Sequence, residues 1–243
     1  MEVCANSLES ALEAQRGGAI RVELCDNLAE GGTTPSYAQI ALAKEHLSIK
    51  VYPIIRPRGG DFLYNEMEFN IMKSDIKICK ALNCDGVVIG ILNADGSIDM
   101  ERCAELIELA SPMPVTFHRA FDMSYNLETS LEAVVSLGCE RILTSGGESS
   151  AINGAEMIAK LIKQAAGRII IMPGAGINTG NIAKLIKTTG ASEFHASAKH
   201  AVKSNMVYRN PRLNMGSVAD EFSYDLTDAD TVKILIELAN KPG

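Results

Sequence analysis

Short runs rich in β-branched residues alternate with helical patterns along almost the whole chain, and this alternation restricts the fold more than any other feature of the sequence. A short apolar run is typical of a buried strand, and apolar residues spaced three and four apart are typical of an amphipathic helix. We expect strands over residues 2–5, 20–25, 49–56, 86–91, 114–118, 141–144, 168–173 and 192–196. We expect helices over residues 8–15, 37–45, 66–82, 100–109, 127–137, 155–165, 179–187 and 229–239.

The number and order of these elements match a (β/α)8 TIM barrel. The chain has 243 residues, and about 250 are typical of such a barrel. A doubly wound open sheet shows the same local alternation and is the main alternative. The first expected strand is not followed by a GxGxxG sequence, and no linker divides the chain into halves. We therefore expect one α/β TIM-barrel domain over residues 1–243.

One stretch interrupts the alternation. Residues 197–228 are rich in Asn, Pro, Arg and Met and show neither strand nor helix periodicity over most of their length. We expect an irregular C-terminal extension that packs near the mouth of the barrel or contacts another subunit.

Charge and cysteine usage narrow the partners and the compartment. The net charge is −7 and the basic residues are scattered, so neither nucleic acid nor an anionic membrane is expected as a partner. No apolar run approaches the roughly 20 residues that span a bilayer, and three glutamates in the first thirteen residues argue against a secretory signal. The six cysteines occur singly, without CxxC pairs, as expected for reduced thiols in a cytoplasmic protein.

Charged side chains follow two of the expected strands. The functional residues of a barrel lie at the carboxyl ends of its strands. Arg56 and Arg58 end the strand over residues 49–56, and their forked N–H donors suit a carboxylate or a phosphate. His118 and Arg119 end the strand over residues 114–118. Because histidine titrates near neutral pH, His118 is a candidate for acid–base catalysis, and Arg119 for anion binding.

Glycine-rich turns follow the sixth and seventh expected strands and, together with His195 and Ser197 at the end of the eighth, predict a phosphate cradle. In TIM barrels, backbone N–H groups and a helix N-terminus near the seventh and eighth strands commonly bind phosphate. The expected residues of this cradle are Ser145, Gly146, Gly174, Gly176, His195 and Ser197.

The first two strands share a Glu-x-Cys spacing. Residues two apart on a strand point to the same face, so Glu2 lies beside Cys4 and Glu23 beside Cys25. If that face is the barrel interior, two carboxylates and two thiols converge. Thiols select soft cations such as Cu(I), whereas small buried cysteines can also serve only as core residues. Glu23 is a second candidate for acid–base catalysis, because a carboxylate inside a barrel needs a partner.

Several of these segments together resemble the CutC copper homeostasis family. They are residues 21–25, 30–36, 53–62, 115–122, 143–146, 174–176 and 208–210. The resemblance implies a cytosolic TIM barrel that forms homo-oligomers, either dimers or tetramers, and that takes part in copper handling. It also implies that Cys4 and Cys25 are the copper ligands. Ala5 stands where some members carry the second cysteine of a pair.

Two functional hypotheses follow, and they draw on different residues. The first is a copper homeostasis protein that binds Cu(I) through Cys4 and Cys25. The second is an enzyme that acts on a small phosphorylated or carboxylated metabolite, with acid–base chemistry by Glu23 and His118. A barrel without a reaction of its own is the remaining alternative. No organic cofactor is expected, and the sequence leaves open whether the chain is an enzyme.

Overall fold

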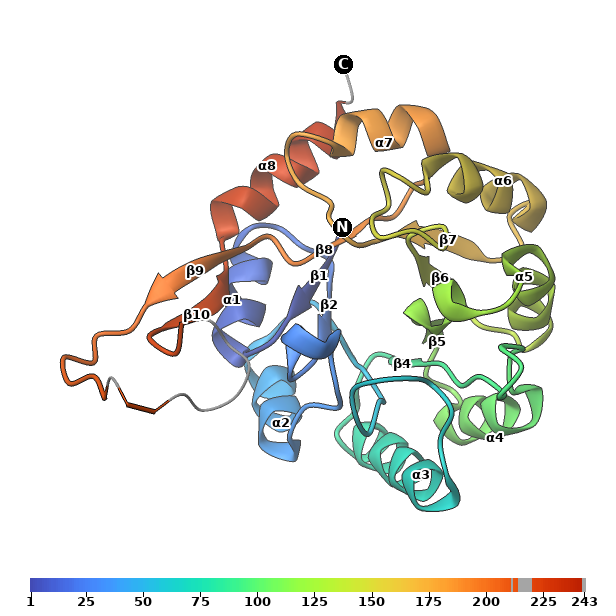
Figure 1. The fold of residues 1–243 in the computed structure, drawn as a ribbon, viewed down its shortest axis with the longest axis horizontal. Coiled ribbons are helices and arrows are strands. Elements are labelled where there is room, and N and C mark those ends of the chain that lie inside the picture. Colours follow the sequence, from blue (N-terminus) through green and yellow to red (C-terminus); the bar gives the residue numbers. More distant parts are fainter. Residues whose placement is uncertain (211, 214–219, 242–243) are drawn as a thin grey trace.

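Parallel strands form the centre of the molecule, and helices surround them (Figure 1). The structure is a computed structural model that describes residues 1–210, 212–213 and 220–241. The barrel strands are β1 (Glu2–Ala5), β2 (Arg21–Leu24), β3 (Lys50–Pro53), β4 (Val87–Ile89), β5 (Val115–Phe117), β6 (Arg141–Thr144), β7 (Ile170–Pro173) and β8 (His195–Ala196). The helices are α1 (Leu8–Arg16), α2 (Tyr37–His46), α3 (Glu66–Ala81), α4 (Met100–Ala110), α5 (Leu127–Ser136), α6 (Ala155–Ala165), α7 (Ile182–Thr189) and α8 (Ala229–Asn240).

Hydrogen bonding divides the strands into two parallel sheets. One sheet has the order β3-β2-β1-β8, and the other has the order β4-β5-β6-β7. A parallel bridge between Ile54 and Val88 joins β3 to β4. The strand order and the outer ring of helices confirm the predicted (β/α)8 barrel (Figure 1).

Alternation along the strands separates a polar interior from an apolar outer layer. On β1, Val3 and Ala5 pack in the main hydrophobic core together with buried residues of the helices. Glu2 and Cys4 occupy the alternate positions and are also buried, but they contact other interior side chains. The same period of two holds on β2, where Glu23 lies opposite Cys4 in the strand register. The interior of this barrel therefore carries charged groups and thiols instead of an all-aliphatic filling.

The helix boundaries follow the predicted ones closely, with one informative exception. Helix α7 begins at Ile182, three residues later than expected. The side chain of Asn178 accepts a hydrogen bond from the backbone N–H of Gly180, and that of Asn181 accepts one from the N–H of Asn178. These side-chain bonds hold the chain in a turn, since asparagine competes with the backbone for helical hydrogen bonds.

The stretch over residues 197–228 is more regular than expected. It contains β9 (Lys199–Lys203) and β10 (Ser223–Thr227), which pair as an antiparallel hairpin. The hairpin extends from the barrel beside α1 (Figure 1), where the N–H of Thr227 donates to the Ser10 hydroxyl at 3.2 Å. Residues 211 and 214–219 of this stretch lie outside the described residues, and its contact with another subunit stays a prediction. Among the described helices, none is both long and apolar enough to cross a membrane.

Candidate functional site

A cavity of about 420 Å³ opens among the carboxyl ends of the strands. Its walls come from both sheets, because β1, β2, β8 and the loop after β3 supply one side, whereas β6 and the segments after β5 and β7 supply the other. The lining includes Cys4, Glu23, Arg56, Phe62, His118, Arg119, Asp122, Leu143, Gly176, His195 and Ser197. Small-molecule sites have volumes of about 300–1,000 Å³, so the cavity is large enough for a metabolite as well as for a metal ion.

Two thiols meet in the barrel interior. The Sγ atoms of Cys4 and Cys25 lie 3.5 Å apart, and both residues are buried. Cys4 also belongs to a group with Glu23 and His195, in which one ligand atom from each residue lies within 4.8 Å of the others. One point in the interior is therefore surrounded by the Cys4 sulfur, an imidazole and a carboxylate, and the Cys25 sulfur contacts that of Cys4.

The hydrogen bond from Cys25 favours the protonated form of Cys4. This bond, together with burial and the nearby Glu23 carboxylate, raises the pKa of Cys4 well above its ordinary value. A metal ion that binds sulfur displaces the thiol proton, because thiolate is the ligand form. All six cysteines lie in the described part of the chain, and each is free and buried.

His195 lies between two buried carboxylates. Its Nδ1 is 2.7 Å from Oε1 of Glu2, and its Nε2 is 3.6 Å from Oε2 of Glu23. Burial alone would lower the pKa of His195, but the charges of Glu23 and Glu2 outweigh it and raise the pKa. Burial raises the pKa of Glu23, and its Oε1 atom has no hydrogen-bond partner among the described residues. The Nε2 atom of His195 and the Glu23 carboxylate therefore face each other at the cavity wall, at a distance longer than that of a hydrogen bond.

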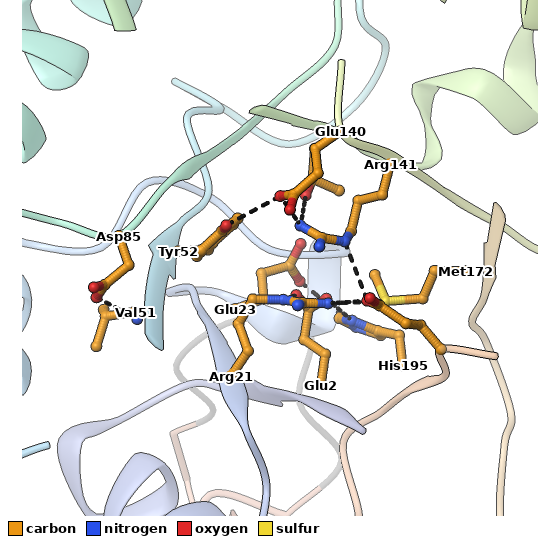
Figure 2. Close-up of polar contacts among 12 residues, drawn as sticks. Glu2, Arg21, Glu23, Val51, Tyr52, Asp85, Glu140, Arg141, Met172 and His195 are labelled. Atoms are coloured by element: carbon orange, nitrogen blue, oxygen red, sulfur yellow. Dashed lines mark hydrogen bonds and ion pairs between the residues drawn. The ribbon is translucent and has the colours of Figure 1, made fainter. Parts of the chain in front are cut away.

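Glu2 fixes the position of His195 from inside the barrel. Its carboxylate is buried and also contacts the Arg21 guanidinium (Figure 2). Burial would raise the pKa of Glu2, but the hydrogen bonds and charges of His195 and Arg21 lower it to about 2. Glu2 therefore stays ionised, and it orients the imidazole with Nε2 toward Glu23.

A layer of ion pairs lies next to Glu2. Arg21 donates to Glu193 at 2.6 Å, and Arg141 bonds Glu140 at 2.7 Å and Glu193 at 3.2 Å. The Tyr52 hydroxyl donates to Glu140 at 3.1 Å, and both guanidinium groups lie against the Tyr52 ring (Figure 2). This layer was not predicted from the sequence, although the Arg21-x-Glu23 spacing carries the same period-two signal as the Glu-x-Cys spacing.

His118 is buried at the cavity wall in its neutral form. Burial and then the positive charge of Arg56 lower its pKa to about 3. Its Nδ1 accepts a hydrogen bond from the backbone N–H of Ala120 at 3.1 Å. Since a neutral imidazole carries one proton, that proton is on Nε2. Nε2 is buried and has no hydrogen-bond partner among the described residues, so His118 offers a donor to the site.

The three predicted anion-binding arginines lie in different surroundings. Arg56 is buried and lines the cavity. Arg119 lines the cavity at a more exposed position and bonds Asp122 at 2.8 Å and the Ser145 hydroxyl at 2.9 Å. Arg58 does not line the cavity and bonds Glu68 and Asp61 instead. The structure therefore places Arg56 at the cavity and Arg58 outside its lining, and anion binding by these arginines stays a prediction.

The predicted phosphate cradle is also only partly present at the cavity. Gly176 and Ser197 line it, together with His195. Gly174 lies outside the lining because its backbone packs tightly, and a Cβ there would approach Leu143 to 2.5 Å. Gly146 similarly packs against Gly154.

The predicted donor role of Ser145 does not fit its contacts. Its N–H and hydroxyl both donate to the Asp122 carboxylate. Like Gly174 and Gly146, Ser145 does not line the cavity.

Comparison with known proteins links this geometry to one family. The sequence model of the CutC family matches residues 1–200. The chain is 52% identical to a family protein CutC of Chromobacterium violaceum, over 99% of this chain and 98% of that one. It is 48% identical to the copper homeostasis protein cutC homolog of Homo sapiens, over 98% of this chain and 88% of that one.

Solved structures support the same grouping. A CutC structure from Streptococcus agalactiae, described as that of a copper homeostasis protein, superposes with a TM-score of 0.77 at 38% identity, over 81% of this chain and 97% of that one. Phosphoribosyl anthranilate isomerase from Thermotoga maritima superposes with a TM-score of 0.60 at 14% identity, over 98% of this chain and 97% of that one. At that identity the isomerase shares the barrel fold alone.

Proposed function

The chain belongs to the CutC copper homeostasis family, and from that premise we propose that it binds one Cu(I) ion between Cys4 and Cys25. The observation that carries the proposal is the 3.5 Å separation of the two Sγ atoms inside the barrel. Thiolate sulfur selects Cu(I) over the hard divalent cations. Ala5 cannot supply a second thiol on β1, but Cys25 at the end of the neighbouring strand supplies one.

His195 and Glu23 complete the proposed ligand set. Both lie within reach of the Cys4 sulfur, and the Nε2 atom of His195 faces the same point from β8. Imidazole is a good copper ligand once it has lost its proton. Binding therefore releases protons from the thiols and from His195, so the affinity for Cu(I) should rise with pH.

The reduced cysteines also support a cytoplasmic location for this function. All six are free and buried, and thiols persist where the compartment is reducing. A copper ion that must stay cuprous needs the same condition.

We further propose that the chain forms a homo-oligomer through the arm formed by residues 204–210, which follows β9. Three consecutive apolar residues, Met206, Val207 and Tyr208, are exposed there, and Val207 is 96% exposed. Contiguous apolar surface of this kind is typical of a protein–protein contact.

An anaerobic titration with Cu(I) against a competing chelator tests the copper proposal. We expect the wild-type protein to bind one copper ion and the Cys4→Ser, Cys25→Ser double variant to bind none at the same chelator concentration. Cys103→Ser is the matched control, because Cys103 is buried in the outer core and donates to the carbonyl of Ile91. Equal copper affinity in the wild type and in the double variant would contradict the proposal.

A further inference from the structure

Arg56 is a buried cation without an anionic partner among the described residues. The guanidinium groups of Arg21 and Arg141 are equally buried, and each contacts carboxylates. Arg56 is 4% exposed, and none of its ion-pair distances to the carboxylates of the described residues falls within 4.0 Å. A buried charge is costly unless another charge or a full set of hydrogen bonds compensates it. Arg56 therefore stands out from these other buried arginines as the one that an external anion would complete.

The contacts of Arg56 hold its guanidinium in place without neutralising it. Its Nη1 atom donates to the carbonyl oxygens of Glu30 at 2.8 Å and of Gly32 at 2.7 Å, and Nη2 donates to that of Gly60 at 2.8 Å. The Nε atom is buried and has no partner among the described residues. Carbonyl dipoles orient the group, so it is pre-organised to receive a negative charge.

His118 supplies a second unused donor next to Arg56. The Phe62 ring lies 5.0 Å from the Arg56 guanidinium carbon and 5.1 Å, between centroids, from the His118 ring. Within the described part of the chain, the Nε atom of Arg56 and the Nε2 atom of His118 are both buried and unpartnered, and all three residues line the cavity. Phe62 is only half-buried, and its ring lies beside both the Arg56 guanidinium and the His118 imidazole.

A copper ion at the thiols does not account for these features. A cation adds positive charge to the barrel and leaves the charge of Arg56 uncompensated. The cavity of about 420 Å³ is also far larger than one ion requires. In the same cavity, Glu23 offers a further oxygen, Oε1, that is unpartnered among the described residues and can bond a hydroxyl group of a larger molecule.

We propose that the cavity binds a small organic anion, whose carboxylate or phosphate group displaces the Phe62 ring and pairs with Arg56 and His118. The Nε–H of Arg56 and the Nε2–H of His118 donate to the anionic oxygens. The rest of the molecule extends through the cavity toward Glu23 and His195. Arg119, at the exposed edge of the same cavity, attracts the anion before it enters.

Calorimetric titration of the copper-free protein tests this site. The probes are inorganic phosphate, glycerol 3-phosphate and lactate, which separate phosphate from carboxylate recognition. We expect at least one probe to bind the wild-type protein and to bind Arg56→Met at least about 30-fold more weakly, since the loss of a buried charge partner costs about 2 kcal/mol or more. Arg58→Met is the matched control, because Arg58 carries the same group outside the cavity, and it should bind the probe as the wild type does.

The outcomes separate this site from the copper site. Cys25→Ser removes a proposed copper ligand that does not line the cavity, and this variant should keep its full affinity for the anion, so each proposal can fail alone. If no probe binds, or if Arg56→Met and Arg58→Met bind equally well, no anion pairs with Arg56 and the proposal is overturned.

Arg56→Met also removes hydrogen bonds to three loop carbonyl oxygens and can unfold the loops. A second variant therefore tests the site while leaving Arg56 in place. Phe62→Ala uncovers the two donors, and it should bind inorganic phosphate at least as tightly as the wild type. A tenfold weaker binding by Phe62→Ala would likewise overturn the proposal.

Discussion

Replacing Glu2 by glutamine tests how far the buried carboxylate beside His195 stabilises the fold. Burial would raise the pKa of Glu2, but His195 and Arg21 lower it from 4.5 to about 2. A carboxyl group whose pKa is lower in the folded chain than in the unfolded chain stabilises the fold when it is ionised. The stabilisation is about 1.4 kcal/mol for each unit by which the two pKa values differ. We therefore expect Glu2→Gln to lower the free energy of unfolding at pH 7 by about 3 kcal/mol, as for other broken buried ion pairs.

The pH dependence of the same variant gives a second check. The ionised Glu2 carboxylate contributes its full stabilisation above the unfolded pKa of 4.5 and loses it as the pH falls through the folded value of about 2. The free-energy difference between the wild type and Glu2→Gln should therefore shrink from about 3 kcal/mol at pH 7 to about 2 kcal/mol near pH 3.5. Urea denaturation followed by circular dichroism across this pH range measures the difference.

Glu132→Gln is the control that can refute this reasoning. Hydrogen bonds from Arg168 and Gln164 lower the pKa of Glu132 to about 2 as well, but Glu132 and Arg168 are exposed. Solvent screens an exposed pair, so this variant should change the stability very little. If Glu2→Gln proved no more destabilising than Glu132→Gln, the cost of burying the Glu2 carboxylate would cancel the benefit of its partners.

Three further predictions address other parts of the molecule. Gly90→Ala should destabilise the protein by about 1–3 kcal/mol in thermal or urea unfolding, because the new Cβ would lie 2.5 Å from the His118 ring and 2.9 Å from Ala120. His118 should stay neutral with its proton on Nε2 from pH 8 down to about pH 4 in nitrogen-15 NMR spectra, and a titration step between pH 6 and 7 would contradict its lowered pKa. Val207→Asp with Tyr208→Ser should reduce the mass measured by light scattering toward that of one chain, whereas an unchanged mass would exclude this arm from the subunit contact.

The barrel is predictable from the sequence because the pattern repeats. Eight strand–helix pairs each bury an aliphatic face, and the period of two along the first two strands is enough to place Glu2, Cys4, Glu23 and Cys25 on one face. The same pattern could not show the hairpin of β9 and β10. β9 is mostly exposed, β10 is mostly half-buried, and both are rich in polar residues, so they lack the apolar periodicity of a barrel strand.

The site is harder to predict, because several of its residues lie in loops. The period of two tells which face a strand residue points to, but no such period gives the direction of a loop side chain. Arg56 and Arg58 are two residues apart in a loop, yet Arg56 lines the cavity and Arg58 bonds Glu68 outside it. The ion pair between Arg21 and Glu193 joins residues 172 positions apart in the sequence. Contacts of that kind depend on the closure of the barrel, which no local pattern encodes.

The division of the barrel into two sheets has a mechanical consequence. The sheets are joined through the bridge between Ile54 and Val88, and within the described residues no strand pairing joins β7 to β8. Each sheet is therefore a half-shell with its own hydrogen-bond ladder, and the cavity lies across both seams, with Arg56 and His195 on one shell and His118 on the other. A molecule bound in the cavity would contact both half-shells and so stabilise their association. Its binding would then slow the hydrogen exchange of the backbone amides along both seams.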